Sequence, residues 1–180
     1  MLRKDWEEKI KPELAEKLGF SNLHEVPALE KIVVHMGIAA EKDDPALIEE
    51  FSKQLGLITG QKPRINRAKK AVSGFKLRKG EIVGLKSTLR GKRMYDFVEI
   101  IVKLILPRLR DFRGLPTSKF DSQANYSLGI SEQTVFPTLP TEEIKRIKGV
   151  EITFVVSSAK KKQVKELLLA LGLPLVEKGK

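Results

Sequence analysis

The chain has 180 residues, 41% of them hydrophobic, which is enough for one ordinary domain with a sizeable core. It has no cysteine, which excludes disulfides, thiolate catalysis and thiolate metal ligands and is typical of a reducing cytosol. The formal net charge of +11 indicates a polyanionic partner.

Membrane insertion is not expected from this sequence. No apolar run approaches the roughly 20 residues of a membrane span, and the polar residues 1–14 do not have the pattern of a secretory or transit signal. We therefore expect a cytoplasmic protein with no membrane partner.

The first segments predict a helix followed by a strand. Apolar residues at helical spacing over 6–18 predict a helix with a kink or restart at Pro12 and an end at Gly19. Residues 29–40 are rich in β-branched side chains and alternate in polarity, which predicts a half-buried strand. Its apolar face is Ile32, Val34 and Met36, and its other face is Lys31, Val33 and His35.

A second helix and a basic segment come next. Asp44 and Pro45 suit the N-cap and first position of a helix that ends at Gly60. Residues 61–80, QKPRINRAKKAVSGFKLRKG, are rich in Lys and Arg, contain no carboxylate and are broken by proline and glycine, so we read them as strand and loop. In residues 81–91, an apolar face of Val83, Leu85 and Leu89 alternates with Gly84, Lys86, Thr88 and Arg90.

The second half of the sequence completes an α+β pattern. Residues 93–106 predict a buried helix that stops at Pro107, and a long irregular region follows with a strand only at NYSLGIS. VEITFVVSS predicts the last strand, and apolar residues over 164–171 predict a closing helix. We expect a single domain over residues 1–180, an antiparallel sheet with helices packed on one face and the other face open and basic.

The open face predicts contacts with nucleic acid. Helices on the apolar side would leave a cationic surface with few aromatics, which suits phosphate and sugar better than base stacking. Its residues are Lys31, His35, Lys86, Thr88 and Arg90. Each one alone could equally be a solvated strand residue, and it is their clustering that favours RNA. A membrane-surface helix is the weaker alternative, because the basic segment lacks helical continuity.

The catalytic signatures that we considered are absent from the sequence. It has no GxGxxG, GxxxxGK[ST] or GxSxG motif, and His24 and His35 lack neighbours at a metal-ligand spacing. We therefore expect no enzyme activity, no cofactor and no metal. A nuclease or phosphotransferase that uses the cationic face stays open as an alternative, with His35 as its one candidate base.

Four segments carry a family resemblance: ITGQKPRINRAKKAVSGFKLRKG, STLRGKRMYDFVE, LPRLRDFRGL and NYSLGISEQTVFP. In this order and spacing they resemble the large-subunit ribosomal protein L5 family of bacterial type, over nearly the whole chain. The resemblance implies binding of 5S rRNA, its attachment to 23S rRNA in the central protuberance, and contacts with P-site tRNA, small-subunit protein S13 and neighbouring central-protuberance proteins. A free-standing RNA-binding module or RNA chaperone of the same fold is the runner-up.

The resemblance also implies three sets of site residues. The 5S rRNA surface would consist of Lys31, His35, Gln61, Arg64, Lys86, Thr88 and Arg90. The tRNA contact would be a pliable loop, residues 68–80, through Lys69, Lys70, Ser73, Phe75, Lys76, Arg78 and Lys79. Phe75 either anchors this loop or stacks on RNA, and we prefer the anchoring role. The bridge to the small subunit would include Arg110, Asp111 and Arg113.

Three positions depart from the family pattern. His35 stands where the family usually has Asn, and residues 120–126 read FDSQANY where FDGRGNY is usual. The last helix opens with Lys160 to Lys162 where the family is often acidic. An imidazole and an amide make different hydrogen bonds, so the RNA contact at position 35 is expected to differ.

Overall fold

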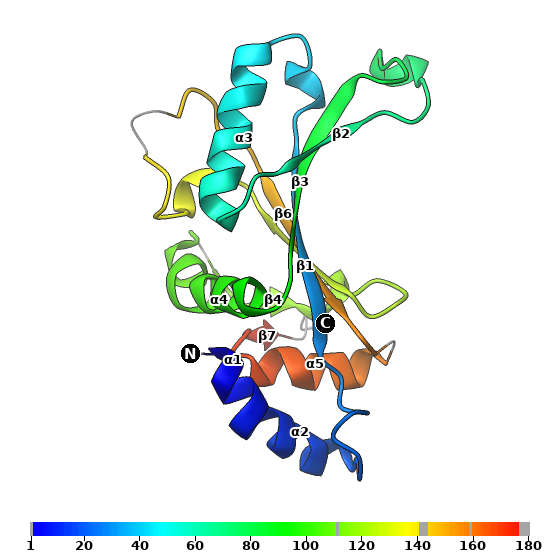
Figure 1. Ribbon diagram of the computed structural model, residues 1–180, viewed down its shortest axis with the longest axis vertical. Coiled ribbons are helices and arrows are strands. Elements are labelled where there is room, and N and C mark those ends of the chain that lie inside the picture. Colours follow the sequence, from blue (N-terminus) through cyan, green and yellow to red (C-terminus); the bar gives the residue numbers. More distant parts are fainter. Residues whose placement is uncertain (1, 111, 141–143, 159, 177–180) are drawn as a thin grey trace. The chain divides into compact units, whose positions relative to one another are not determined.

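The computed structural model describes residues 2–110, 112–140, 144–158 and 160–176. It is an α+β structure built on a five-stranded antiparallel sheet with the strand order β2-β3-β1-β6-β5, in agreement with the predicted fold class (Figure 1). The strands are β1 (Leu29–Gly37), β2 (Arg64–Arg67), β3 (Ile82–Leu89), β5 (Tyr126–Ile130) and β6 (Val150–Val156).

Packing divides the chain into two compact units. Unit 1 comprises residues 1–32, 90–128 and 153–180, and unit 2 comprises residues 33–89 and 129–152. A single domain over the whole chain stays a prediction.

Unit 2 contains the long helix α3 (Pro45–Thr59), which packs against β3. Its N-cap is Asp44, whose side chain accepts hydrogen bonds from the Ala46 and Leu47 amides at 3.0 and 3.1 Å, and Pro45 is its first residue. Gly60 ends it in the left-handed conformation, with φ +66°. These are the boundaries that the sequence predicts, because all three signals are local. Phe51, Leu55 and Leu85 are fully buried in the core of this unit.

Strands β1 and β3 alternate between a buried and a half-buried face, as the sequence predicts. In β1, Val34 and Met36 are fully buried, whereas Val33 and His35 are half-buried. In β3, Lys86 and Thr88 alternate with buried residues. Two positions on the apolar face of β3 differ from the prediction: Val83 is only half-buried, and the polar Ser87 is buried among the apolar residues.

Unit 1 contains the N-terminal helices and the helix before Pro107. α1 (Leu2–Asp5), the π-helical turn η1 (Trp6–Ile10) and α2 (Lys11–Leu18) run on without a break, and Gly19 ends them. α4 (Lys92–Ile100) continues into the π-helical turn η4 (Ile101–Ile105) and the 3-10 turn η5 (Leu106–Arg108). The predicted restart at Pro12 is present, because α2 begins at Lys11 with Pro12 as its second residue, and the helix with Pro107 ends at Arg108, one residue beyond the predicted stop. The π-helical turns before the two prolines were not predicted, and they fit residues that lack an amide hydrogen.

The C-terminal part of unit 1 consists of short elements and a last helix. α5 (Lys161–Ala170) is the predicted closing helix, and it contacts α2. The irregular region contains β5 at the predicted place and the 3-10 turn η6 (Thr117–Lys119). It also contributes β4 (Leu115–Pro116), which pairs in parallel with β7 (Leu175–Val176). The 3-10 turns η2 (Ala39–Glu41), η3 (Ser73–Phe75) and η7 (Gln133–Val135) belong to unit 2.

Candidate RNA interface

Strands β2 and β3 place basic side chains side by side. The two strands are antiparallel, and Arg64 lies opposite Lys86 in the register. Directly opposed residues project from the same face of a sheet, so these two cations form a pair on one surface. Arg64 is exposed and Lys86 is half-buried. Like charges placed together in this way create a site for an anion.

A polar hollow of about 350 Å³ lies at this end of the hairpin. Gln61 connects two lining residues of this hollow. The Gln61 side-chain nitrogen donates to Ser87 Oγ at 2.9 Å and to the Thr88 carbonyl oxygen at 2.8 Å. The geometry therefore gives Gln61 a bracing role, in which its amide fixes the end of β3 beside the cations. The hollow is lined by Gln61, Lys62, Arg64, Asn66, Lys86, Ser87 and Thr88.

His35 lies directly over the backbone of Gly84 in the neighbouring strand. A Cβ atom at position 84 would be 2.6 Å from His35 Nε2 and 2.9 Å from the Met36 carbonyl oxygen, so a side chain there would clash. On its other side, His35 borders a shallow hollow of about 400 Å³ that is lined by Gly37, Gly129, Gly149 and Glu151, among others. Glycines make this part of the open face smooth, so that a bulky ligand can approach the strand backbones.

The seven predicted 5S rRNA residues are divided between the two units. His35, Gln61, Arg64, Lys86 and Thr88 belong to unit 2. Lys31 and Arg90 belong to unit 1, where Lys31 is half-buried on β1 and Arg90 is exposed just after β3. The geometry of the site therefore rests on the five residues of unit 2.

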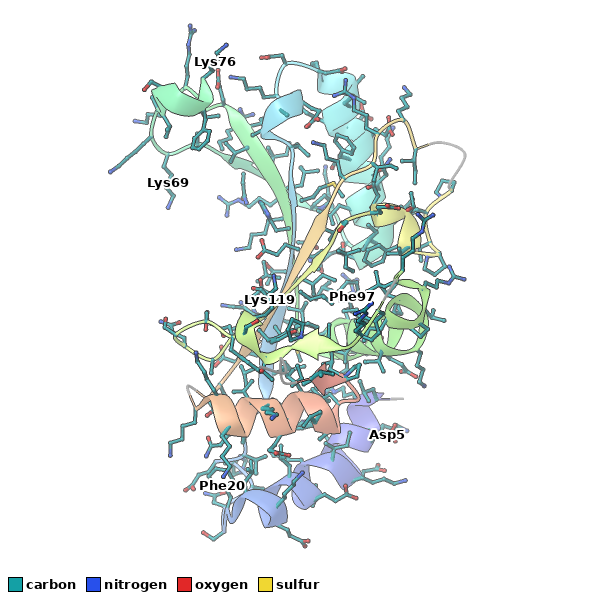
Figure 2. The ribbon with its side chains drawn as sticks, turned by 180° about the vertical axis from the view of Figure 1, so that it is seen from behind. Asp5, Phe20, Lys69, Lys76, Phe97 and Lys119 are labelled. Atoms are coloured by element: carbon teal, nitrogen blue, oxygen red, sulfur yellow. The ribbon has the colours of Figure 1, made fainter. Side chains whose placement is uncertain are left out.

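The basic loop, residues 68–80, is the tip of the β2–β3 hairpin (Figure 1). Figure 2 labels Lys69 and Lys76 on this loop, and the lysines and arginines of the loop are all exposed. Phe75 is 83% exposed, so the preferred anchoring role for this side chain is wrong. An aromatic ring with this exposure is available for a partner.

The base of the loop is fixed by hydrogen bonds across the hairpin. The Ala68 amide donates to the Glu81 carbonyl oxygen at 2.8 Å, and the Gly80 amide donates to the Ala68 carbonyl oxygen at 2.9 Å. Arg67 also donates to the Gly80 carbonyl oxygen at 3.0 Å. The predicted pliable loop therefore has a closed, hydrogen-bonded base.

An ion pair adds to this base from outside the hairpin. Lys42 Nζ lies 2.7 Å from Glu81 Oε2, and the Arg78 amide donates to the same oxygen at 2.8 Å. The Lys42 hydrogen bond, followed by the Arg78 amide, holds the pKa of Glu81 below its usual value. The carboxylate is thus charged at neutral pH and holds both partners.

The predicted bridge residues lie in unit 1. Arg110 and Arg113 are both exposed on the segment after η5, and Asp111 lies outside the described residues. Among the residues that the structure describes, no group of three or more His, Cys, Asp or Glu could hold a metal ion. None of the described helices is long and apolar enough to cross a membrane.

Comparison with known proteins decides the family. A family model described as ribosomal protein L5 matches residues 22–78, and one described as the C-terminus of the same ribosomal family matches residues 82–175. The chain belongs to the ribosomal protein L5 family. Together the two L5 models span the sheet, α3 and most of the hairpin, and only residues 79–81 lie between the two matches.

Relatives in the L5 family are similar along almost their whole length. Large ribosomal subunit protein uL5 of Thermotoga sp. (strain RQ2) is 45% identical over 173 residues, which cover 96% of this chain and 94% of the relative. The uL5 protein of Protochlamydia amoebophila is 46% identical, with 96% and 93% covered. That of Thermus aquaticus is 44% identical, with 96% and 95% covered.

Several residues of this candidate site were not predicted. Lys62, Asn66 and Ser87 line the polar hollow, and the alternation of β2 could have indicated Asn66, which lies two residues after Arg64. The Lys42–Glu81 pair joins residues far apart in sequence, and no local pattern signals such a contact.

Proposed function

We propose that this chain is a structural component of the large ribosomal subunit that binds 5S rRNA through the open face of its sheet. In this role it attaches the 5S rRNA to 23S rRNA in the central protuberance, beside neighbouring proteins. The observation that carries the proposal is the Arg64–Lys86 pair beside the polar hollow. Phosphates are bound by such groups of cations and polar side chains, without reading base sequence. Family membership makes the chain a ribosomal protein of the cytoplasm, which favours this role over a free-standing RNA chaperone or a nuclease.

Salt dependence tests the 5S rRNA contact. If the face meets about six phosphates, the log–log slope of affinity against salt is expected near −5. Arg64→Ala should weaken 5S rRNA binding about tenfold and make the slope shallower by about one. The measurement is filter binding of 5S rRNA over a range of salt concentrations.

The matched control is Lys53→Ala, which removes one positive charge from the exposed surface of α3. It should leave the affinity and the slope close to those of the wild type. A wild-type slope shallower than about −2, or equal losses in both variants, would contradict a phosphate-binding sheet face.

The exposed loop, residues 68–80, is proposed to contact P-site tRNA. It presents cations and an exposed Phe75, and it contains no carboxylate. Contacts with phosphates suit this task, because they are independent of tRNA sequence. Changing Lys69, Lys70, Arg78 and Lys79 together to Ala should leave 5S rRNA affinity within about tenfold, a free-energy loss of no more than ~1.4 kcal/mol.

Ribosomes that carry this quadruple variant should assemble and release P-site tRNA faster than wild-type ribosomes. If 5S rRNA affinity collapses while tRNA release stays unchanged, the loop belongs to the 5S rRNA site.

The segment around Arg110 and Arg113 is proposed to bridge to small-subunit protein S13. The solvent-accessible arginines of this segment support the role, and crosslinking from position 113 in intact ribosomes tests it.

A further inference from the structure

The tip of the hairpin is a compact turn that presents Phe75 to solvent. Val72 and Leu77 form an isolated antiparallel bridge, with amide-to-carbonyl hydrogen bonds of 2.8 and 3.2 Å. Between them, the Phe75 amide donates to the Val72 carbonyl oxygen at 3.2 Å. Lys76 has a φ of +49°, which is uncommon for a residue with a side chain and requires surrounding contacts to hold it.

Lys42 supplies one of these contacts from outside the hairpin. Its Nζ donates to the Lys76 carbonyl oxygen at 2.6 Å while it pairs with Glu81 Oε2. The side chains of Lys42 and Glu81 are only 17% and 28% exposed, so water competes weakly for this contact. One ammonium group therefore ties both the residue after Phe75 and the end of the loop to the segment that follows β1.

From these contacts we propose that the Lys42–Glu81 pair is a clamp that preorganises the tip, and that the clamped Phe75 stacks on a nucleobase of the RNA that the loop contacts. The inference rests on the proposed contact with tRNA and adds the residue that meets a base and the pair that positions it. Fixing a loop in its bound shape before binding reduces the ordering cost of binding.

The surroundings of Phe75 favour RNA over an apolar protein surface. Exposed cations flank it on both sides in the chain, at positions 69, 70, 76, 78 and 79. An aromatic ring among lysines and arginines suits a base and its neighbouring phosphates, because the ring stacks and the cations neutralise charge. A protein partner would have to cover this charge with carboxylates.

The first test separates stacking from general apolar contact. Phe75→Leu keeps an apolar side chain and should speed tRNA release from reconstituted ribosomes about tenfold, whereas Phe75→Tyr keeps the ring and should release tRNA like the wild type. Equal release in all three would overturn the stacking role. If the quadruple lysine and arginine variant also releases tRNA normally, it is the proposed tRNA contact that fails.

A spectroscopic test reads the contact directly. The wild-type chain has one tryptophan, Trp6, which is 5% exposed and gives a constant background. In the full-length Phe75→Trp variant, binding of an unmodified tRNA transcript at low salt should quench the new fluorescence, because stacked bases quench indole. Binding without quenching would overturn base stacking.

The clamp is tested by removing a negative charge. Glu81→Gln breaks the ion pair with Lys42. In the Phe75→Trp protein, adding Glu81→Gln should therefore weaken the fluorescence quenching by tRNA. Ribosomes that carry Glu81→Gln alone should release tRNA faster. If Glu81 were simply a carboxylate that repels RNA, its removal should tighten binding. The two ideas therefore predict opposite signs.

Asp43→Asn is the matched control. Asp43 lines a hollow of about 440 Å³ at the base of the loop, which Lys42 and Glu81 also line. Its substitution removes one negative charge, as Glu81→Gln does, but leaves the Lys42–Glu81 ion pair in place. It should leave quenching unchanged. Equal behaviour of the Asp43 and Glu81 variants would overturn the clamp. Glu81→Asp, which keeps the charge, should recover part of the quenching.

Discussion

The imidazole of His35 covers the backbone of Gly84, and this contact makes position 84 intolerant of any side chain. Gly84→Ala would place a methyl group 2.6 Å from His35 Nε2 and 2.9 Å from the Met36 carbonyl oxygen. The His35 ring can move, but the backbone oxygen cannot move without shifting β1. We expect a loss of about 1–3 kcal/mol in the free energy of unfolding, measured by urea denaturation.

The control for this substitution is Gly129→Ala on β5. Gly129 is exposed, and a Cβ there meets nothing within 4 Å. That variant should be as stable as the wild type or slightly more stable. Equal stability of the Gly84 and Gly129 variants would contradict the close approach of β1 and β3.

Residue-level prediction from sequence succeeded where the signal was local. The alternation of β1 placed His35 opposite the apolar face, because side chains alternate along any strand. The anchoring role for Phe75 failed, because a single aromatic in a basic loop does not reveal whether the fold provides a pocket for it. Lys42 was not singled out, since its partners lie 34 and 39 positions away.

At the scale of elements, a polar network attaches residues 144–148 to η2 and η7. Glu41 is buried, and its Oε1 pairs with Lys148 Nζ at 2.7 Å and with Arg146 at 3.4 Å. Gln133 is fully buried, donates to the Arg146 carbonyl oxygen at 2.8 Å and accepts from the Lys148 amide. The segment is thus held by charge and hydrogen bonds, while Ile147 is 60% exposed.

Glu41→Gln should loosen this segment. The substitution removes the charge that both cations share, so we expect the free energy of unfolding to fall by about 1–3 kcal/mol. Amide hydrogen exchange should become faster at residues 145–148. Glu49→Gln breaks an exposed pair with Lys53 and should change stability by less than about 0.5 kcal/mol. A similar cost for both variants would contradict the burial of Glu41.

Element boundaries followed the sequence where caps define them. α3 begins and ends as expected, because Asp44, Pro45 and Gly60 act within one turn of the backbone. The π-helical turns before Pro12 and Pro107 were not expected, since tertiary packing decides whether a helix continues past a proline. The pairing of β4 with β7 joins two strands of two residues each, too short for a sequence pattern.

At the scale of the whole molecule, the two tyrosines of the chain give unit 1 a stability limit in alkali. Burial raises the pKa of both Tyr95 and Tyr126 to about 12. Tyr95 stacks on Trp6, with ring centroids 6.3 Å apart, and the Tyr126 hydroxyl donates to the Pro116 carbonyl oxygen at 3.3 Å. The folded state therefore favours the protonated phenols.

The sign of the pH effect follows from these raised pKa values. Their contribution to stability is complete below pH of about 10, the unfolded value, and is lost as the pH rises through the folded value. Tyrosinate absorbance and circular dichroism should therefore change together as the pH rises from the unfolded to the folded pKa value of the tyrosines. Tyr126→Phe should retain more of its stability at high pH than the wild type. Titration of both tyrosines near their ordinary value in a folded chain would contradict this prediction.

The position of β2 in the strand order has a consequence for the chain before it meets RNA. β2 pairs with β3 and forms one end of the five-stranded order, and its register shifts between Asn66 and Arg67. A free strand edge is a template on which other chains can add strands and aggregate. Exposed arginines at positions 64 and 67 and an irregular register both oppose such pairing. The charge that we propose binds RNA at this edge therefore also protects newly made copies from one another.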